Sequence, residues 1–218
     1  MRFLIGVTTC HKFIERANAQ RRTWVPDAIA AGIDVKFFLG RREGVFTQEL
    51  KPYPEDVVKL DVSDEYRFLP LKVQAMFAWS AEQGYDFTLK TDDDTVVRPY
   101  NLLKELGDYI GHSNRLYCSG FGYTLSRRAA EIVAQATWDE DPVEDRWVGG
   151  VLAAAGITPQ DSPNRLIFRP QCGYRCREHW RPSATGWENC PDCAISKQNA
   201  SVVCPYDTPG YVEQLYRL

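Results

Sequence analysis

The chain has 218 residues, which is enough for one large core and somewhat beyond the commonest single-domain length, so we expect one domain with an appendage. With 26 Lys and Arg against 29 Asp and Glu, the net charge is −3, which gives no general attraction to nucleic acid or to an anionic membrane surface. No apolar run has the length of a membrane span, and the N-terminal apolar stretch is too short for a signal peptide. We therefore expect a soluble, cytoplasmic protein with no nucleic-acid partner.

Residues 1–160 alternate short apolar runs with segments of helical period, a pattern that is typical of an α/β sheet covered by helices. The expected strands, in chain order, are Phe3–Thr8, Asp34–Leu39, Val57–Val62, Asp86–Lys90, Leu116–Cys118 and Gly122–Leu125.

Four helices are expected from apolar residues that recur at helical spacing and so share one face. The first carries Leu69, Val73, Met76 and Phe77, and the second, after Pro99, carries Leu102, Leu103, Leu106 and Ile110. The third starts at Ser126 as N-cap and carries Ala129, Ile132, Val133 and Ala136. The fourth carries Trp147, Val148, Val151, Leu152 and Ala155 and ends at Gly156.

The alternating pattern fails near residue 160, and residues 161–218 form a segment rich in Pro, Gly, Arg and Cys. We expect a catalytic core over 1–160, with 161–218 as a Cys-rich segment that packs on it and ends in a short helix over 207–218. Two close cysteine pairs, separated by thirteen residues, have a spacing compatible with a tetrahedral structural zinc site. The four cysteines are Cys172, Cys176, Cys190 and Cys193. Cys204 and His179 are alternative ligands, and disulfides or free thiols are alternative states.

Three consecutive aspartates, Asp92, Asp93 and Asp94, directly follow the strand that ends near Lys90. Open α/β sheets place ligands at the carboxyl ends of their strands, and three adjacent carboxylates repel one another unless a divalent cation lies among them. Strand alternation predicts that Asp92 and Asp94 face one way and Asp93 the other. The alternative is a solvated acidic turn. The apolar residues on either side, among them Leu89, favour a rigid site.

A second carboxylate pair, Glu144 and Asp145, stands immediately before the apolar face of the fourth helix. Acidic residues in a first helical turn are favoured by the helix dipole, which is a sufficient structural reason for the pair. The functional alternative is that Asp145 acts as a general base across a cleft from Asp94.

Five motifs in this order resemble a known family. They are RRTW at 21–24, FFLG at 37–40, LKTDDDTVV at 89–97, YCSGFGYTLS at 117–126 and EDRWVGGVLAAAGI at 144–157. Together they resemble the inverting β1,3-glycosyltransferases, which include the β1,3-galactosyltransferases, the β1,3-N-acetylglucosaminyltransferases and Fringe. The resemblance covers roughly residues 16–157.

The resemblance implies a GT-A fold, a Rossmann-like mixed and mostly parallel sheet with flanking helices, that uses Mn²⁺ or Mg²⁺ and a UDP-sugar donor and transfers to a saccharide acceptor. It implies Asp145 as catalytic base and Asp94, with Asp92, as metal ligands. The donor-binding residues that it implies are Arg22, Lys90, Asp92, Asp93, Gly120, Tyr123 and Glu144, and Arg16 and Arg21 compete with Arg22 for its role.

Two features depart from the family pattern. Family members are typically membrane-anchored Golgi enzymes, whereas this chain starts at its first strand, which suggests a bacterial, phage or viral setting. The family also supplies a C-terminal histidine as a further metal ligand, and Cys204 stands where that histidine is expected. His179 is a candidate to replace it.

The sequence therefore predicts a metal-dependent, inverting glycosyltransferase that moves a hexose or N-acetylhexosamine from a UDP-sugar to a saccharide hydroxyl in β1,3 linkage. The alternative is a zinc-stapled binding module with a degenerate, inactive glycosyltransferase site.

Overall fold

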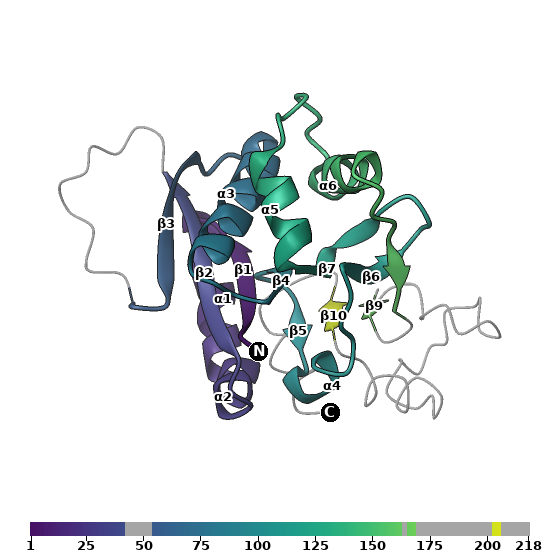
Figure 1. Ribbon diagram of the computed structural model, residues 1–218. Helices are drawn as coiled ribbons and strands as arrows, with labels where there is room; N and C mark the ends of the chain where they lie inside the picture. Colours follow the sequence, from purple (N-terminus) through teal and green to yellow (C-terminus); the bar gives the residue numbers. More distant parts are fainter. Residues whose placement is uncertain (42–53, 163–164, 169–201, 206–218) are drawn as a thin grey trace, which may run out of the picture.

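The computed structural model describes residues 1–41, 54–162, 165–168 and 202–205, and its centre is a seven-stranded sheet with the order β3-β2-β1-β4-β7-β6-β8 (Figure 1). The strands are β1 (Phe3–Thr9), β2 (Asp34–Arg41), β3 (Val57–Ser63), β4 (Phe87–Asp92), β6 (Tyr109–Ser113), β7 (Cys118–Ser126) and β8 (Gln160–Asp161). Strands β1 to β4 run parallel, whereas β7 is antiparallel to both of its neighbours. The sheet is mixed and mostly parallel, as predicted.

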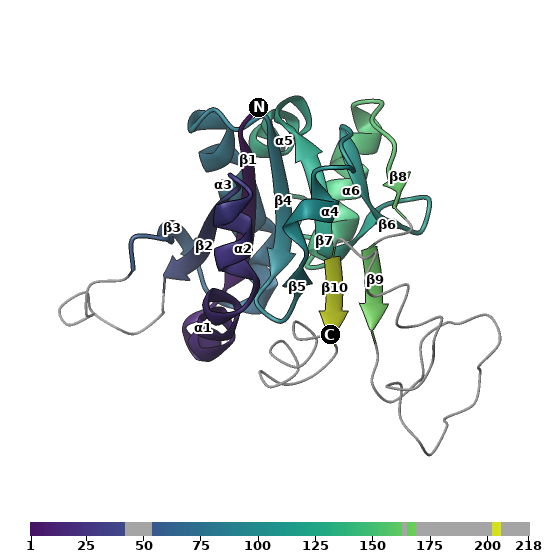
Figure 2. The same ribbon diagram turned by 90° about the horizontal axis from the view of Figure 1, so that it is seen from below.

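Helices cover both faces of this sheet (Figures 1 and 2). One face carries α1 (Ile14–Arg22) and α2 (Trp24–Ala30), and the other carries α3 (Leu69–Glu82), α5 (Arg127–Gln135) and α6 (Glu144–Ala154). Alternation along β1 divides the core accordingly, because Ile5 packs with Trp24 of α2 while Leu4 packs with Met76 of α3. Short 3-10 helices lie at His11–Phe13 and Tyr66–Phe68.

A second sheet of three strands, in the order β5-β10-β9, adjoins the first (Figure 2). Its strands are β5 (Val96–Val97), β9 (Arg165–Phe168) and β10 (Val202–Pro205). Arg165 is fully buried and joins the two sheets, because its guanidinium donates to Thr124 Oγ1 of β7 at 2.8 Å and to the Ile110 carbonyl of β6 at 2.5 Å. Strand β5 directly follows the aspartates, so the second sheet borders the predicted site.

Most of the expected elements are confirmed with small differences in their bounds. The helix expected from Leu69 is α3, the helix capped by Ser126 is α5, with the Ser126 hydroxyl accepting from Ala129 N, and the fourth is α6. Gly156 follows the fourth helix with φ +77°, a conformation that glycine adopts without strain.

Two expectations are wrong. The second helix stops early, since α4 spans only Pro99–Leu102 and Ile110 lies in strand β6, paired with Thr124 of β7. The two short strands expected near Cys118 are one continuous strand, β7, because the glycines between them lie extended between β4 and β6. A Cβ at Gly111 would lie 2.7 Å from Cys118 Cβ, so close pairing of β6 with β7 requires glycine there. Both errors come from sheet neighbours that local spacing does not reveal.

Helices α1 and α2 are not among the elements expected from apolar spacing. The buried face of α1 consists of Ala17, Ala19 and Gln20, which give little apolar periodicity. In the part of the chain that the structure describes, no helix has the length and apolar character needed to cross a membrane. The predicted zinc cysteines Cys172, Cys176, Cys190 and Cys193, His179 and the predicted closing helix lie outside the described residues.

Candidate functional site

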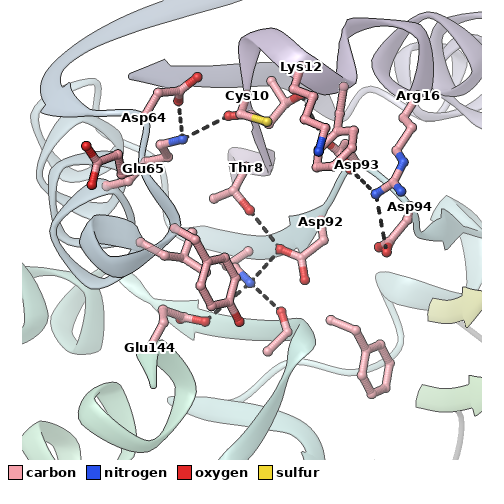
Figure 3. Close-up of a pocket in the computed structure, with 18 of the residues that line it drawn as sticks. Thr8, Cys10, Lys12, Arg16, Asp64, Glu65, Asp92, Asp93, Asp94 and Glu144 are labelled. Atoms are coloured by element: carbon pink, nitrogen blue, oxygen red, sulfur yellow. Dashed lines mark hydrogen bonds and ion pairs between the residues drawn. The ribbon is translucent and has the colours of Figure 1, made fainter. Parts of the chain in front are cut away.

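A cavity of about 1130 Å³ lies at the C-terminal ends of β1, β2 and β4, where α/β sheets bind their ligands. Its walls come from segments far apart in the sequence, and Figure 3 shows several of their side chains converging on it. The wall segments are Thr8–Phe13, Asp64–Tyr66, Asp92–Asp94, Ser119–Phe121 and Val143–Asp145. Both predicted carboxylate groups, the aspartates and the Glu144-Asp145 pair, therefore border one cavity.

The aspartates lie at the end of β4, in a turn closed by a hydrogen bond from Thr95 N to the Asp92 carbonyl at 3.2 Å. Gln20 Nε2 donates to the carbonyls of Asp92 and Thr95 at 2.9 and 2.8 Å, and Trp24 Nε1 donates to the Thr95 carbonyl at 3.1 Å. Gln20 and Trp24 come from the region of the RRTW motif, so the motif and the residue before it hold the backbone of the turn.

Two threonines at the end of β1 each bind a different one of the first two aspartates. Thr8 Oγ1 donates to Asp92 Oδ1 at 2.7 Å, and Thr9 Oγ1 donates to Asp93 Oδ2 at 2.9 Å. Because successive strand residues point to opposite sides, the two carboxylates are held on different sides of the strand end.

The third aspartate lies beside the second. Arg16 Nη1 is 3.4 Å from Asp93 Oδ1 and 3.9 Å from Asp94 Oδ2. Figure 3 marks these contacts as dashed lines. The charge of Asp92 also acts on Asp94, so the three carboxylates form one electrostatic cluster. The strand ends at Asp92, and alternation does not continue through the turn that follows.

Burial and mutual repulsion shift the titration of these aspartates. Burial raises the pKa of Asp93 to about 7, against the hydrogen bond from Thr9, and the neighbouring aspartates raise it further. Burial and the charge of Asp92 raise the pKa of Asp94 to about 6. The described residues that line the cavity include seven carboxylates against five Lys and Arg. The cavity therefore favours a cation.

The Glu144-Asp145 pair opens helix α6 on the opposite wall of the cavity. Asp145 Oδ2 accepts a hydrogen bond from Gly120 N of β7 at 3.0 Å. Glu144 is buried, accepts from the Tyr123 hydroxyl, and lies 3.3 Å from Lys90 Nζ. Burial raises the pKa of Glu144 to about 7, although the Lys90 charge opposes that shift.

Lys90 is 1% exposed and lies between the two carboxylate groups. Its ammonium contacts Asp92 Oδ1 at 2.7 Å, Glu144 Oε2 at 3.3 Å and the Gly120 carbonyl at 2.5 Å. Burial alone would lower the pKa of Lys90, but the charges of Asp92 and Glu144 outweigh it and hold the pKa above its ordinary value. The lysine therefore remains charged and bridges β4, β7 and α6.

The structure brings most of the predicted site residues together. Arg16 lines the cavity, whereas Arg22 is exposed on α1 away from it and Arg21 pairs with Asp56 at 2.7 Å. Tyr123 is fully buried behind Glu144 and does not line the cavity.

Sequence reasoning missed Thr8, Thr9 and Gln20 as partners of the aspartates. The Thr-Thr pair at the end of the first strand was a usable signal, since β1 and β4 are parallel and adjacent and end at the same edge. Cys204 lies on β10, which pairs with β5 directly after the aspartate turn.

The resemblance implies a divalent cation, and the side chains that line the cavity offer carboxylate oxygens to it. Within the described ranges, no group of three or more His, Cys, Asp or Glu is arranged to hold a metal ion by itself. The Asp94 carboxylate is 36% exposed toward a cavity with excess negative charge, and carboxylate oxygens suit Mg²⁺ and Mn²⁺. These residues fit a cation that completes its coordination with substrate and water oxygens.

The sheet order, the flanking helices and the position of the cavity define a GT-A fold. Among solved structures, the chain is similar to a glycosyltransferase involved in the glycosylation of the major capsid of PBCV-1. The TM-score is 0.57 and the sequence identity is 14%, over 100% of both chains. This likeness concerns the fold.

Residues 15–116 match the family model for galactosyltransferases. The chain is 26% identical over 228 residues to the probable beta-1,3-galactosyltransferase 12 of Arabidopsis thaliana, covering 81% of this chain and 60% of the relative. It is 30% identical over 123 residues to the probable beta-1,3-galactosyltransferase 13 of the same plant, covering 50% and 36%. It is 24% identical over 217 residues to the Homo sapiens beta-1,3-galactosyltransferase 2, covering 78% and 49%. The chain is similar to these galactosyltransferases, as its motifs predicted, and it spans between about a third and three fifths of their length.

Proposed function

We propose that this protein is a metal-dependent, inverting glycosyltransferase that transfers a hexose or N-acetylhexosamine from a UDP-sugar to a saccharide hydroxyl in β1,3 linkage. The observation that carries the proposal is that Asp145 and the aspartate turn border the same cavity from opposite walls. The reaction needs a general base and a diphosphate clamp at the same donor sugar, and the candidates for both line this cavity. The named activities of the relatives support the transfer of a hexose or an N-acetylhexosamine. They do not favour an inactive binding module.

In this reaction Asp145 is the general base. Its carboxylate takes the proton of an acceptor hydroxyl, and the hydroxyl oxygen attacks the anomeric carbon of the donor sugar from the face opposite the nucleotide. The new C–O bond forms as the bond from the anomeric carbon to the diphosphate breaks, and UDP leaves with the electron pair. A single displacement of this kind inverts the linkage from α to β.

The donor diphosphate lies, in our proposal, against the aspartate turn. Asp94, with Asp92, would hold Mn²⁺ or Mg²⁺, which neutralises the charge on the departing diphosphate. Arg16 supplies a guanidinium beside Asp93 and Asp94, and it faces the cavity as Arg22 does not. We therefore assign to Arg16 the nucleotide-side role that the motif alone gave to Arg22.

The test is release of UDP by purified protein from a panel of UDP-sugars, with a saccharide acceptor, in Mn²⁺, in Mg²⁺ and with a chelator. We expect release from one donor that depends on both metal and acceptor. Release that persists in chelator would refute metal dependence. No release from any donor, together with no binding of UDP in Mn²⁺, would refute the proposed function.

A matched pair of variants locates the metal. Asp94→Asn should abolish the Mn²⁺-dependent part of UDP binding, measured by calorimetry. Asp139→Asn is the control, because Asp139 is an aspartate in an exposed loop outside the residues that line the cavity. Equal metal-dependent binding by both variants would exclude Asp94 as a ligand.

A further inference from the structure

The ammonium of Lys90 is fully engaged within the protein. An ammonium has three N–H donors, and three acceptors surround Nζ: Asp92 Oδ1, the Gly120 carbonyl and Glu144 Oε2. The side chain is 1% exposed, although its residue borders the cavity. No N–H of this lysine is left to donate to a phosphate, so direct binding of the donor is not its role.

The backbone of Gly120 lies between Lys90 and the proposed base, Asp145, and hydrogen-bonds to both. Its carbonyl accepts from Lys90 Nζ at 2.5 Å, and its N–H donates to Asp145 Oδ2 at 3.0 Å. A Cβ on this residue would lie 3.1 Å from Glu144 Oε2 and 3.5 Å from Asp145 Oδ2. The Glu144 and Asp145 carboxylates of α6 therefore pack on Gly120, one of the two glycines in β7.

Lys90 thus touches both halves of the proposed reaction site. On one side it binds Asp92 of the aspartate turn directly, and on the other it reaches α6 through Glu144 and, by way of Gly120, Asp145. Strand β4 also pairs with β7, so the contacts of Lys90 join β4, β7 and α6 at the point where the aspartate turn begins.

We propose that Lys90 and Gly120 are positioning residues. They hold the Asp145 carboxylate at a fixed position relative to the aspartate turn. The inference rests on the proposed function and names a role in the same site. Catalysis by a positioned base is sensitive to displacement, and a shift of 1 Å can lower the rate by roughly 10²-fold. Their substitution therefore lowers turnover by moving Asp145, while the affinity for UDP is retained.

The first experiment compares two glycine-to-alanine variants. Gly120→Ala places a methyl group against the two carboxylates, whereas Gly150→Ala, on α6, has open space around its Cβ. We expect Gly120→Ala to lower kcat by roughly 10- to 100-fold, with the KM for donor and the Kd for UDP in Mn²⁺ changed less than threefold. Gly150→Ala should leave all three unchanged. A rise in the UDP Kd that accounts for the whole loss would overturn the proposal.

The second experiment asks whether the loss passes through Asp145. When Gly120→Ala is combined with Asp145→Asn, the glycine substitution should cause no further loss of turnover, because the group that it displaces is already inactive. The same fold-loss in both backgrounds would show a general disturbance of the site and would overturn the proposal.

The third experiment treats Lys90 itself, with Arg16 as the matched cation. We expect Arg16→Met to weaken UDP binding more than Lys90→Met, since Arg16 faces the cavity and Lys90 has no free N–H. Lys90→Met weakening UDP binding at least as much would return Lys90 to a donor-binding role. If Lys90→Met does not fold, Gly120→Ala decides the question alone.

Crystal structures of the wild type and of Gly120→Ala give a readout that needs no activity. The Asp145 carboxylate should move relative to an unchanged aspartate turn, and an unmoved carboxylate would overturn the proposal. Because this result stands even if no donor releases UDP, failure of the inference is distinguishable from failure of the proposed function.

Discussion

Two buried lysines lie on either side of the end of β1, and their partners differ. Lys72, on α3, donates to Asp64 Oδ1 at 2.5 Å and to the Thr9 carbonyl at 2.9 Å. The Asp64 carboxylate also accepts from the backbone N–H groups of Gly40 and His11 at 3.0 and 2.9 Å. These contacts, which we call the Lys72 cluster, hold the C-terminal ends of β1, β2 and β3 against α3.

Lys90 instead joins two carboxylates, Asp92 and Glu144, that belong to opposite walls of the cavity. Lys72 has one carboxylate partner, Asp64, which binds the ends of neighbouring strands, whereas Lys90 has two carboxylate partners whose relative position matters to the proposed chemistry. A buried ion pair is therefore not informative by itself. The groups to which its partners are attached indicate what it does.

The largest effect on turnover is expected at Asp145, which is linked to Lys90 through Gly120. Asp145→Asn keeps the size of the side chain but removes the proposed base, so turnover should fall by roughly 10²–10⁴-fold while UDP binding changes little. Steady-state release of UDP and calorimetric binding check the two quantities. Turnover equal to that of the wild type would remove Asp145 from the mechanism.

The Lys72 cluster should respond in stability. Lys72→Met leaves Asp64 as a buried charge without its cation, which should lower the free energy of unfolding by about 3–5 kcal/mol. Denaturant unfolding measures the loss, and Lys104→Met, at an exposed position, is the control. If Lys72→Met lowered turnover of the folded protein as strongly as Gly120→Ala, the two clusters would not differ in the way described.

Glu144 should make stability depend on pH. Burial raises its pKa from an ordinary 4.5 to about 7, with Lys90 and Tyr123 opposing the shift. Between pH 4.5 and 7 the folded protein holds a proton that the unfolded chain has released, so this contribution to stability is present below pH 4.5 and is lost as the pH rises to 7.

The measurement is denaturant unfolding of the wild type and of Glu144→Gln at several pH values. Relative to the variant, the wild type should lose on the order of 3 kcal/mol across this window. Asp92 and Asp145 also face Glu144, but they are present in both proteins. A constant difference across the window would contradict the raised pKa.

The smallest effect is expected away from both lysines. Ser126 caps α5 through its hydroxyl, and Ser126→Ala should cost about 1 kcal/mol of stability, measured by thermal unfolding, with no loss of turnover per folded molecule. If this loss of stability by itself reduced turnover, a fall in turnover caused by Gly120→Ala could not be attributed to displacement of the Asp145 carboxylate.

The sequence was sufficient to predict features that depend on local pattern. Alternation and helical spacing identified β1, β4 and α3, and the position of the aspartates after a strand predicted a site at the edge of the sheet. Charge and motif order identified Glu144 and Asp145, and the structure places both on the cavity wall.

Features that depend on long-range packing were not predictable in the same way. The choice between Arg16 and Arg22 depends on which face of α1 meets the aspartate turn, and the weak apolar periodicity of α1 does not define that face. The resemblance implied a donor-binding role for Lys90, and its contacts with Gly120 and Glu144, 30 and 54 residues away in the sequence, do not show in a local pattern. Ile110 fitted a helical spacing, and only its pairing with β7 makes it part of a strand.

The pairing of β5 with β10 also bears on the order of folding. Strand β5 comes just after the aspartates, and its partner β10 lies more than one hundred residues later in the chain, since Val97 pairs with Val202. Contacts of such sequence separation form late, because the cost of closing the loop comes before the gain from pairing. On the ribosome, the central sheet can therefore assemble while the edge of the aspartate turn still lacks its neighbour. The aspartate turn therefore gains β10 as a neighbour only after residue Val202 has been synthesised.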